Sequence, residues 1–291
     1  MTMAKPFIKW VGGKTQLLDE IRTKYPQSIE KYCEPFVGGG AVLFDILSKF
    51  QPKEILINDI NKNLINTYKE IRYNCENLIL ELKKLQNLYL SKNEVEKKEM
   101  FYEKRSRFNL LDENLEKASL FIFLNKTCFN GLYRVNSKGE FNVPFNNAKN
   151  PLLCDEENLR ECSKLLQNVQ MRVGDYSECK SFIDGITFVY IDPPYRPLRE
   201  TSAFTSYDKN GFSDKNQIEL GNFVSEISKK GAKVVLSNSD PKNTNENDNF
   251  FDELYSQFEI ERVSASRMIN SNAKKRGAIN ELLITNIASV F

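Results

Sequence analysis

The chain has 291 residues and 41% of them are hydrophobic, so it can bury a sizeable core in one large α/β domain or in a domain that carries an insertion. It contains no histidine, which excludes the usual serine and cysteine hydrolase arrangements because they depend on a histidine base. Its net charge of +2 is too small to identify a polyanion as a partner.

The cysteine content and the lengths of the apolar runs further narrow the possible classes of protein. The six cysteines form no CxxC pair, and without histidine a zinc site of the usual ligand set is hard to build, so we expect reduced cysteines and no metal. No apolar run approaches the length that crosses a bilayer, and the first ten residues lack the apolar region of a signal peptide. We therefore expect a cytoplasmic protein with no membrane partner.

Five short apolar runs predict strands that are buried on both faces, as in a parallel-type sheet covered by helices. In chain order they are KYCEPF at 31–36, EILIND at 54–59, ITFVYID at 186–192, AKVVLSN at 232–238 and ELLITN at 281–286. Polar side chains stand where four of these runs finish, namely Glu34, Asp59, Asp192 and Asn238. Open α/β sheets bind ligands at the carboxyl ends of their strands, so this is the predicted active edge.

Between residues 61 and 127 apolar positions recur at three- and four-residue spacing, which predicts helices. Four residues with this spacing are expected in the core: Leu78, Leu82, Leu85 and Tyr89. The following segment, GLYRVNSKGEFNVPF, alternates around a Ser-Lys-Gly-Glu turn and predicts a β-hairpin in which Gly139 takes a positive φ. A helical cluster and a hairpin thus interrupt the α/β pattern.

The segment EPFVGGG at 34–40 follows a predicted strand and precedes a helix, so its glycines would let a ligand approach the backbone at a helix N-terminus. It is not a complete GxGxxG fingerprint, because Leu43 stands at the third glycine position. The segment GGKT at 12–15 likewise fails as a phosphate-binding P-loop, since Ile8 stands where that motif needs glycine. The glycine loop favours a small-molecule site, with a plain tight turn as the alternative.

The tetrapeptide Asp192-Pro193-Pro194-Tyr195 directly follows a predicted buried strand. Two prolines cannot continue a strand and they fix the backbone, so the Asp192 carboxylate and the Pro193 carbonyl can be held rigidly as two acceptors. An exocyclic amine presents two N–H groups to such acceptors, and Tyr195 offers a flat face on which a base can stack. The motif therefore predicts a site for a planar amine, and a plain loop is the alternative for the tetrapeptide taken alone.

The chain resembles the Dam family of adenine-N6 DNA methyltransferases over nearly its whole length. The matching segments occur in the family's order: FIKWVGGK, EPFVGGG, NDINKNLI, FNGLYRVNSKGEFNVPF and DPPYRPLRETSAFTSY. The resemblance implies an α/β fold, with a Rossmann-like methyltransferase sheet in a catalytic domain at 1–60 and 151–291. It also implies an inserted helical and β-hairpin target-recognition domain at 61–150. The implied reaction is methyl transfer from S-adenosylmethionine to adenine N6 in double-stranded DNA at GATC, with release of S-adenosylhomocysteine. We also expect a monomer that needs no metal.

The family pattern assigns residues to the cofactor and to catalysis. The implied cofactor residues are Trp10, Lys14, Phe36, Gly38, Gly39, Gly40, Asp59, Asp175, Tyr176 and Asp192, and the implied catalytic residues are Asp192, Pro193, Pro194 and Tyr195. In this pattern Asp59 bonds the ribose hydroxyls, a task that suits a carboxylate at a strand end. Asp175 matches an acidic position beside the cofactor's adenine, with a helix cap as its alternative role.

The pattern also assigns residues to DNA. Arg134 matches an arginine that reads guanine, and a guanidinium can donate two hydrogen bonds to guanine O6 and N7. Lys9 matches a second guanine-contacting position, with a solvated lysine as its alternative role. Four residues match positions where the family hairpin enters or supports the major groove: Leu132, Asn136, Asn142 and Pro144.

One departure follows NVPF, where Asn146-Asn147-Ala148 replaces a glycine, arginine and tyrosine that family members often use to hold phosphate and flanking DNA. Losing such a contact would weaken binding and its salt dependence without altering which bases are read.

Two further segments and several rival functions complete the predictions. Five basic residues are a candidate DNA-backbone patch or a solvated loop: Arg262, Arg267, Lys274, Lys275 and Arg276. The segment from Arg196 to Gly211 is a candidate lid over the target base. The same acceptors would serve RNA adenine, cytosine N4 or a protein glutamine, and a catalytically silent DNA-binding protein is a rival from another class. Such an enzyme can serve a restriction–modification system or act alone.

Overall fold

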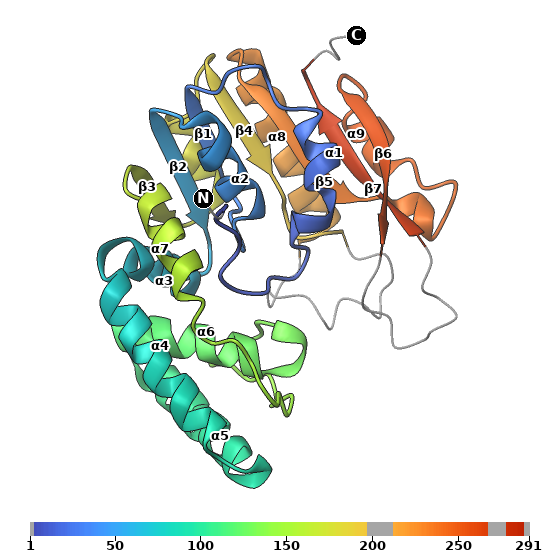
Figure 1. The fold of residues 1–291 in the computed structure, drawn as a ribbon. Helices are drawn as coiled ribbons and strands as arrows, with labels where there is room; N and C mark the ends of the chain where they lie inside the picture. The colour runs from blue at the N-terminus through green and yellow to red at the C-terminus, as the bar shows by residue number, and fades with distance from the viewer. Residues whose placement is uncertain (1–2, 197–211, 267–277, 288–291) are drawn as a thin grey trace. The chain divides into compact units, whose positions relative to one another are not determined.

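The computed structural model describes residues 3–196, 212–266 and 278–287 (Figure 1). The chain divides into two compact units. Unit 1 consists of Met1–Gly13, Val37–Gln51 and Ile57–Asp175, and unit 2 consists of Lys14–Phe36, Pro52–Leu56 and Tyr176–Phe291. The sequence-based division into a catalytic domain and a target-recognition insert follows function and stays a prediction.

The strands form a seven-stranded sheet in the order β3-β2-β1-β4-β5-β7-β6, which confirms the predicted α/β fold. Their bounds are β1 Lys31–Glu34, β2 Glu54–Asp59, β3 Val169–Val173, β4 Thr187–Ile191, β5 Lys233–Ser239, β6 Glu259–Ser266 and β7 Ala278–Thr285. All five predicted runs are strands.

We expected a parallel-type sheet, but the sheet is mixed. β1, β4 and β5 pair in parallel, whereas β7 runs antiparallel to both β5 and β6. The expectation was wrong for β7 because an apolar run carries no information on strand direction. Only residues 267–277 separate β6 from β7, and strands joined by so short a connection pair antiparallel.

Unit 2 has its core on the central strands and on α8 (Asp214–Lys229). Every residue of β1 and of β4 is buried, as predicted for strands covered on both faces. Helix α8 begins at a capping box formed by Ser213 and Asn216 and turns Leu220, Val224 and Ile227 into this core. Its shorter helical segments are η1 (Lys14–Leu17), α1 (Leu18–Arg22), η3 (Tyr176–Ser181), η5 (Pro241–Asn243) and α9 (Phe250–Leu254).

Unit 1 is mainly helical, as the spacing between 61 and 127 predicts. Its helices are α2 (Ala41–Phe50), α3 (Lys62–Tyr73), α4 (Cys75–Leu90), α5 (Glu94–Leu110), α6 (Leu115–Thr127) and α7 (Glu156–Leu165). Helix α6 is buried along nearly its whole length and packs against α3, α4 and α5. Leu78, Leu82 and Tyr89 are buried as predicted, and Leu85 is half-buried. Among the described helices of both units, none is long and apolar enough to span a membrane.

The predicted hairpin follows α6 and the short 3-10 helix η2 (Phe129–Gly131). Antiparallel bridges join Val135 to Phe141 and Cys128 to Phe145. Gly139 lies at the turn with φ 80°, and a side chain there would meet nothing within 4 Å, so the backbone conformation alone requires glycine. These observations confirm the hairpin and its turn.

Candidate functional site

The glycine loop of unit 1 lies against Trp10. Gly38 and Gly40 take positive φ values of 48° and 75°, and Gly40 is the N-cap of α2. A Cβ on Gly38 would come within 2.7 Å of the Trp10 indole, so any larger residue would displace that ring. The structure therefore brings together Trp10 and the loop, both predicted to contact the cofactor.

Asp59, at the end of β2, faces the same loop. Its Oδ2 accepts a hydrogen bond from the Gly38 amide at 3.1 Å, and its Oδ1 accepts one from the Asn61 amide at 2.9 Å. Burial raises the pKa of Asp59 from 3.8 to about 6, although both amide hydrogen bonds oppose the rise. A carboxylate has about four acceptor positions, so Asp59 can also accept from the two hydroxyls of a ribose. This geometry fits the predicted cofactor.

Asp192 follows β4 in unit 2 and is held through one oxygen. Lys14 Nζ lies 2.8 Å from Asp192 Oδ1, and the Ser237 hydroxyl donates to the same oxygen at 3.0 Å. Lys14 is only 3% exposed. Burial raises the pKa of Asp192, Lys14 opposes the rise, and Glu281 adds to it. Among the described residues none donates a hydrogen bond to Oδ2, so this oxygen can receive an amine.

Tyr195 is fixed at both ends. Its hydroxyl donates to Glu281 Oε2 at 2.6 Å, and Lys14 Nζ lies 4.8 Å from the centroid of its ring. Burial, followed by the charges of Asp192 and Glu281, raises the pKa of Tyr195 well above its usual range. The hydroxyl therefore stays protonated and remains a donor.

The prolines between these residues are anchored from α8. Gln217 Nε2 donates to the Pro194 carbonyl at 3.1 Å, and Asn238 donates to Gln217 Oε1 at 3.2 Å. Arg196 closes the loop through hydrogen-bonded ion pairs with Asp214 and Asp248. No described residue donates a hydrogen bond to the Pro193 carbonyl. These contacts anchor the loop that carries Pro193 and Pro194, and the role of the Asp192 carboxylate and the Pro193 carbonyl as paired acceptors stays a prediction.

Two other predicted cofactor residues in unit 2, Phe36 and Tyr176, stack with ring centroids 5.3 Å apart. Both pack on the apolar core of this unit. Asp175, the last residue of unit 1, is exposed and directly precedes η3.

Arg134 is exposed on the hairpin and is oriented by its neighbour. Its Nε donates to Asn142 Oδ1 at 2.8 Å. Asn136 is also engaged within the hairpin, where its amide donates to Glu140 Oε2 at 2.7 Å. Pro144 is exposed and accepts from the Phe129 amide through its carbonyl at 2.9 Å. Asn136, Asn142 and Pro144, all predicted to lie near DNA, therefore also form hydrogen bonds that stabilise the hairpin.

Lys9 is tied to the base of this hairpin through Asn125 of α6. The Lys9 amide donates to Asn125 Oδ1 at 2.9 Å, and Asn125 Nδ2 donates to both the Lys9 and Gly131 carbonyls at 2.8 and 2.9 Å. The Lys9 side chain also packs on Gly131, where a Cβ would come within 2.7 Å of it. Lys9 is thus linked by hydrogen bonds to Gly131, at the base of the hairpin that carries Arg134. These are the two residues predicted to read guanine.

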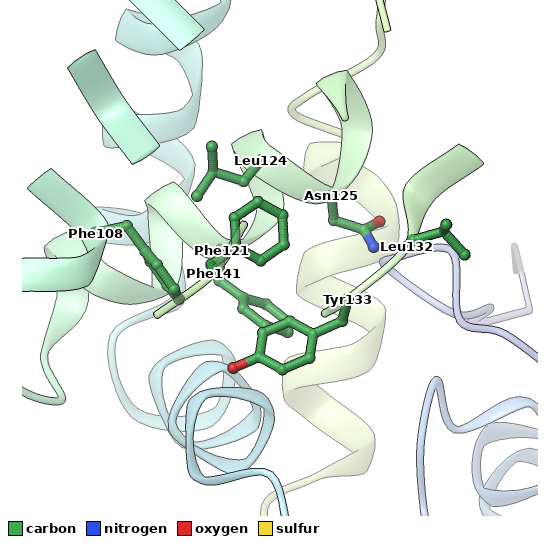
Figure 2. A pocket seen from close by; sticks show the side chains of 7 residues that line it. All are labelled: Phe108, Phe121, Leu124, Asn125, Leu132, Tyr133 and Phe141. Carbon is green, nitrogen blue, oxygen red and sulfur yellow. The ribbon is translucent and has the colours of Figure 1, made fainter. Parts of the chain in front are cut away.

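An aromatic cluster lies beneath the hairpin (Figure 2). Phe108, Phe121, Tyr133 and Phe141 enclose a small apolar pocket, and the predicted groove residue Leu132 also lines it. The Tyr133 ring stacks on Trp10 at 6.1 Å, and its hydroxyl accepts from Asn63 Nδ2 at 2.9 Å. Tyr133 was not predicted to belong to the site. A signal was present, because Tyr133 lies between Leu132 and Arg134, which were both predicted to contact DNA.

The remaining predictions have different outcomes. Arg262 is not a free positive charge, because it pairs with Asp240 and Asp252 at 3.0 and 2.8 Å. The rest of the basic stretch and the segment 197–211 lie outside the described residues. At the departure after NVPF, the Ala148 carbonyl accepts from the Tyr89 hydroxyl at 2.6 Å, which fastens this segment to α4. Within the described ranges, no group of three or more acidic or cysteine residues is placed to hold a metal ion.

Comparison with known proteins gives matches across the chain. A family model described as D12 class N6 adenine-specific DNA methyltransferase matches residues 10–269. Type II methyltransferase M.MjaIII from Methanocaldococcus jannaschii is 48% identical over 291 residues, covering 97% of this chain and 99% of that protein. Type II methyltransferase M1.LlaDCHI from Lactococcus lactis subsp. cremoris is 37% identical, covering 97% and 95%. A DNA adenine methylase from Haemophilus influenzae is 34% identical, covering 96% and 92%.

Proposed function

Because the chain belongs to the D12 class of N6 adenine-specific DNA methyltransferases, we propose that it methylates adenine within GATC and that Asp192, Pro193 and Tyr195 hold the target base. Methyl transfer to adenine in DNA follows from the family itself. We propose the DNA sequence that the enzyme recognises and the residues that carry out the reaction.

The catalytic assignment rests on one observation, which is that the two carboxylate oxygens of Asp192 have different partners. Lys14 and Ser237 both bind Oδ1, so Oδ2 is left for one N–H of the adenine amine. The Pro193 carbonyl accepts the other N–H. The base leaves the duplex at a cost of about a few kcal/mol and stacks on the face of Tyr195 opposite to Lys14.

Charge on N6 explains why an ionised acceptor is useful. Positive charge develops on N6 as the methyl transfers, so Asp192 binds the transition state more strongly than the neutral amine. Lys14 lowers the pKa of Asp192 against the rise that burial causes, and so favours the ionised carboxylate. The N6–methyl bond would form as the sulfur–methyl bond breaks, and N6 would afterwards release one proton to water, so neither a general base nor a metal is required at the transfer step.

The methyl donor is proposed to be S-adenosylmethionine, which supplies an electrophilic methyl group on its sulfonium sulfur. Asp59 accepts the ribose hydroxyls, and Trp10 with Gly38, Gly39 and Gly40 surrounds the nucleoside. Phe36 and Tyr176 contribute aromatic faces, and Asp175 accepts from the adenine of the cofactor.

Specificity is assigned to Arg134 and Lys9. Asn142 accepts from Nε of Arg134 at 2.8 Å and from Nη2 at 3.4 Å, and the remaining N–H groups of the two terminal nitrogens would donate to guanine O6 and N7. Each good base contact contributes about 1–3 kcal/mol of discrimination. We further propose a monomer in the cytoplasm, and a role in a restriction–modification system, because two relatives are named type II methyltransferases.

The test is transfer of a labelled methyl group from S-adenosylmethionine to duplexes that contain GATC or its single-base variants, followed by nucleoside analysis. We expect N6-methyladenine only with GATC, and a rate about a hundredfold to a thousandfold lower with the variant Asp192→Ala. Methylation of another sequence would overturn the assignments of Arg134 and Lys9 but not the chemistry. Label in RNA, in cytosine or in protein alone would overturn the proposed target.

A further inference from the structure

Glu281 of β7 lies behind the residues proposed to hold the adenine. Its Oε2 accepts the Tyr195 hydroxyl at 2.6 Å and lies 3.9 Å from Lys14 Nζ. Its side chain is 14% exposed. In the sheet it pairs with Ser239 on one side and with Val263 on the other, so its backbone is fixed by both neighbouring strands.

The fold does not require a carboxylate at this position. The next three residues of β7, Leu282, Leu283 and Ile284, are buried apolar side chains, and placing a charge beside them costs free energy. Lys14 and Asp192 already form a pair at 2.8 Å, so Glu281 gives the cluster, counted over the described residues, one excess negative charge. An excess negative charge is useful where a positive charge appears during a reaction.

We propose that Glu281 is a positioning residue for adenine methylation, which fixes the Tyr195 ring through its hydroxyl and supplies a second negative charge behind Lys14 and Asp192. This inference rests on the proposed roles of Asp192 and Tyr195. The Tyr195 ring is held by the backbone at one end and by Glu281 at the other, and Lys14 covers one face. A base therefore meets a stacking surface with one fixed orientation.

The charge of Glu281 has a consequence that a packing role does not have. Within the part of the chain that the structure describes, five side chains surround Asp192: Lys14 from η1, Tyr190 from β4, Ser237 from β5, Glu281 from β7 and Tyr195. Burial raises the pKa of Tyr190 and Tyr195 well above their usual range, so both stay neutral. Glu281 is then the group whose charge raises the pKa of Asp192, and neutralising it should lower that pKa.

The experiment compares wild type with Glu281→Gln and Tyr195→Phe, singly and together. Steady-state kinetics on a GATC duplex are measured across pH, and a duplex with 2-aminopurine at the target adenine reports base flipping by fluorescence. Glu261→Gln is the matched control, because Glu261 lies on the neighbouring strand β6 and pairs with Lys24. Thermal melting of each variant checks that it is folded.

For Glu281→Gln we expect kcat to fall about tenfold or more, because small misplacements of a reacting group are costly, while KM for S-adenosylmethionine changes less than about twofold. The acid limb of its kcat profile should move to lower pH. Tyr195→Phe should change the flipping signal, and the double variant should lose less than the product of the two single losses. Glu261→Gln should match wild type.

The proposal is overturned if Glu281→Gln keeps wild-type kcat and an unmoved acid limb, or if the two losses multiply. If Glu281→Gln does not fold, Tyr195→Phe decides alone, since it removes the hydrogen bond and leaves Glu281 in place: unchanged kcat and flipping signal would overturn the idea. Failure of the wild type to methylate GATC, or full activity of Asp192→Ala, would instead overturn the proposed function.

Discussion

The pH dependence of cofactor binding follows from the surroundings of Asp59. Its pKa is raised to about 6, and only the ionised carboxylate accepts fully from two ribose hydroxyls. At pH 7 most molecules carry the ionised form, whereas at pH 5 about one in eleven does. If the cofactor selects the ionised form, its affinity should be about tenfold weaker at pH 5 than at pH 7.

The stability of the free protein should respond in the opposite direction. Burial raises the native pKa of Asp59 from 3.8 to about 6, so the contribution of this group is fully present below pH 3.8 and is lost as the pH rises through 6. The difference amounts to about 3 kcal/mol, because each pKa unit corresponds to about 1.4 kcal/mol. Asp59 thus lowers stability at the pH at which it binds best.

Both effects can be measured with S-adenosylhomocysteine and the variant Asp59→Asn. Titration calorimetry from pH 5 to 8 gives the affinity, and denaturant unfolding over the same range gives the part of the stability change that falls between these pH values, about 1.4 kcal/mol. Subtracting the variant from wild type removes the contributions of other groups. Equal wild-type affinities at pH 5 and pH 7, or the same pH dependence in Asp59→Asn, would refute the assignment of Asp59 to the ribose.

Three further variants test the catalytic and recognition assignments. Asp192→Ala should lower kcat by about a hundredfold to a thousandfold, as does the loss of one transition-state-stabilising group elsewhere, with cofactor affinity measured by calorimetry changing little; equal losses in both would contradict its role. Arg134→Ala should reduce discrimination between GATC and guanine-substituted duplexes by about 1–3 kcal/mol in competition assays. Asn142→Ala should produce a smaller loss of the same kind, and an unchanged specificity in both variants would remove the hairpin from base reading.

Local sequence predicted most elements of the fold because their signals are local. The five apolar runs, the helices between 61 and 127 and the hairpin with Gly139 all have side-chain periodicities or turn residues that can be read within a short window. β6 was missed because Glu259, Glu261 and Arg262 interrupt its apolar pattern at the edge of the sheet. The antiparallel direction of β7 was missed because strand direction depends on connections and not on composition.

The site was predicted only where a motif names its residues. Asp192, Tyr195, Asp59 and the glycine loop stand in such motifs, but their partners come from distant parts of the chain. Glu281 lies 86 positions after Tyr195, and Ser237 lies 45 positions after Asp192. No spacing rule connects residues so far apart. A usable signal was nevertheless present, since both partners are polar residues within or beside runs of buried apolar ones.

The contacts of Trp10 connect the glycine loop to the hairpin. Its indole occupies the space above Gly38, and the same ring stacks on Tyr133 of the hairpin. Lys9, the preceding residue, is bonded through Asn125 to the hairpin base at Gly131. Because the Trp10 indole is closely packed on both sides, a displacement of the hairpin would also displace the glycine loop. Arg134 and Lys9, proposed to read bases, thus share one compact unit with Trp10, the glycine loop and Asp59, while Phe36, Tyr176, Asp192, Tyr195 and Glu281 belong to the other.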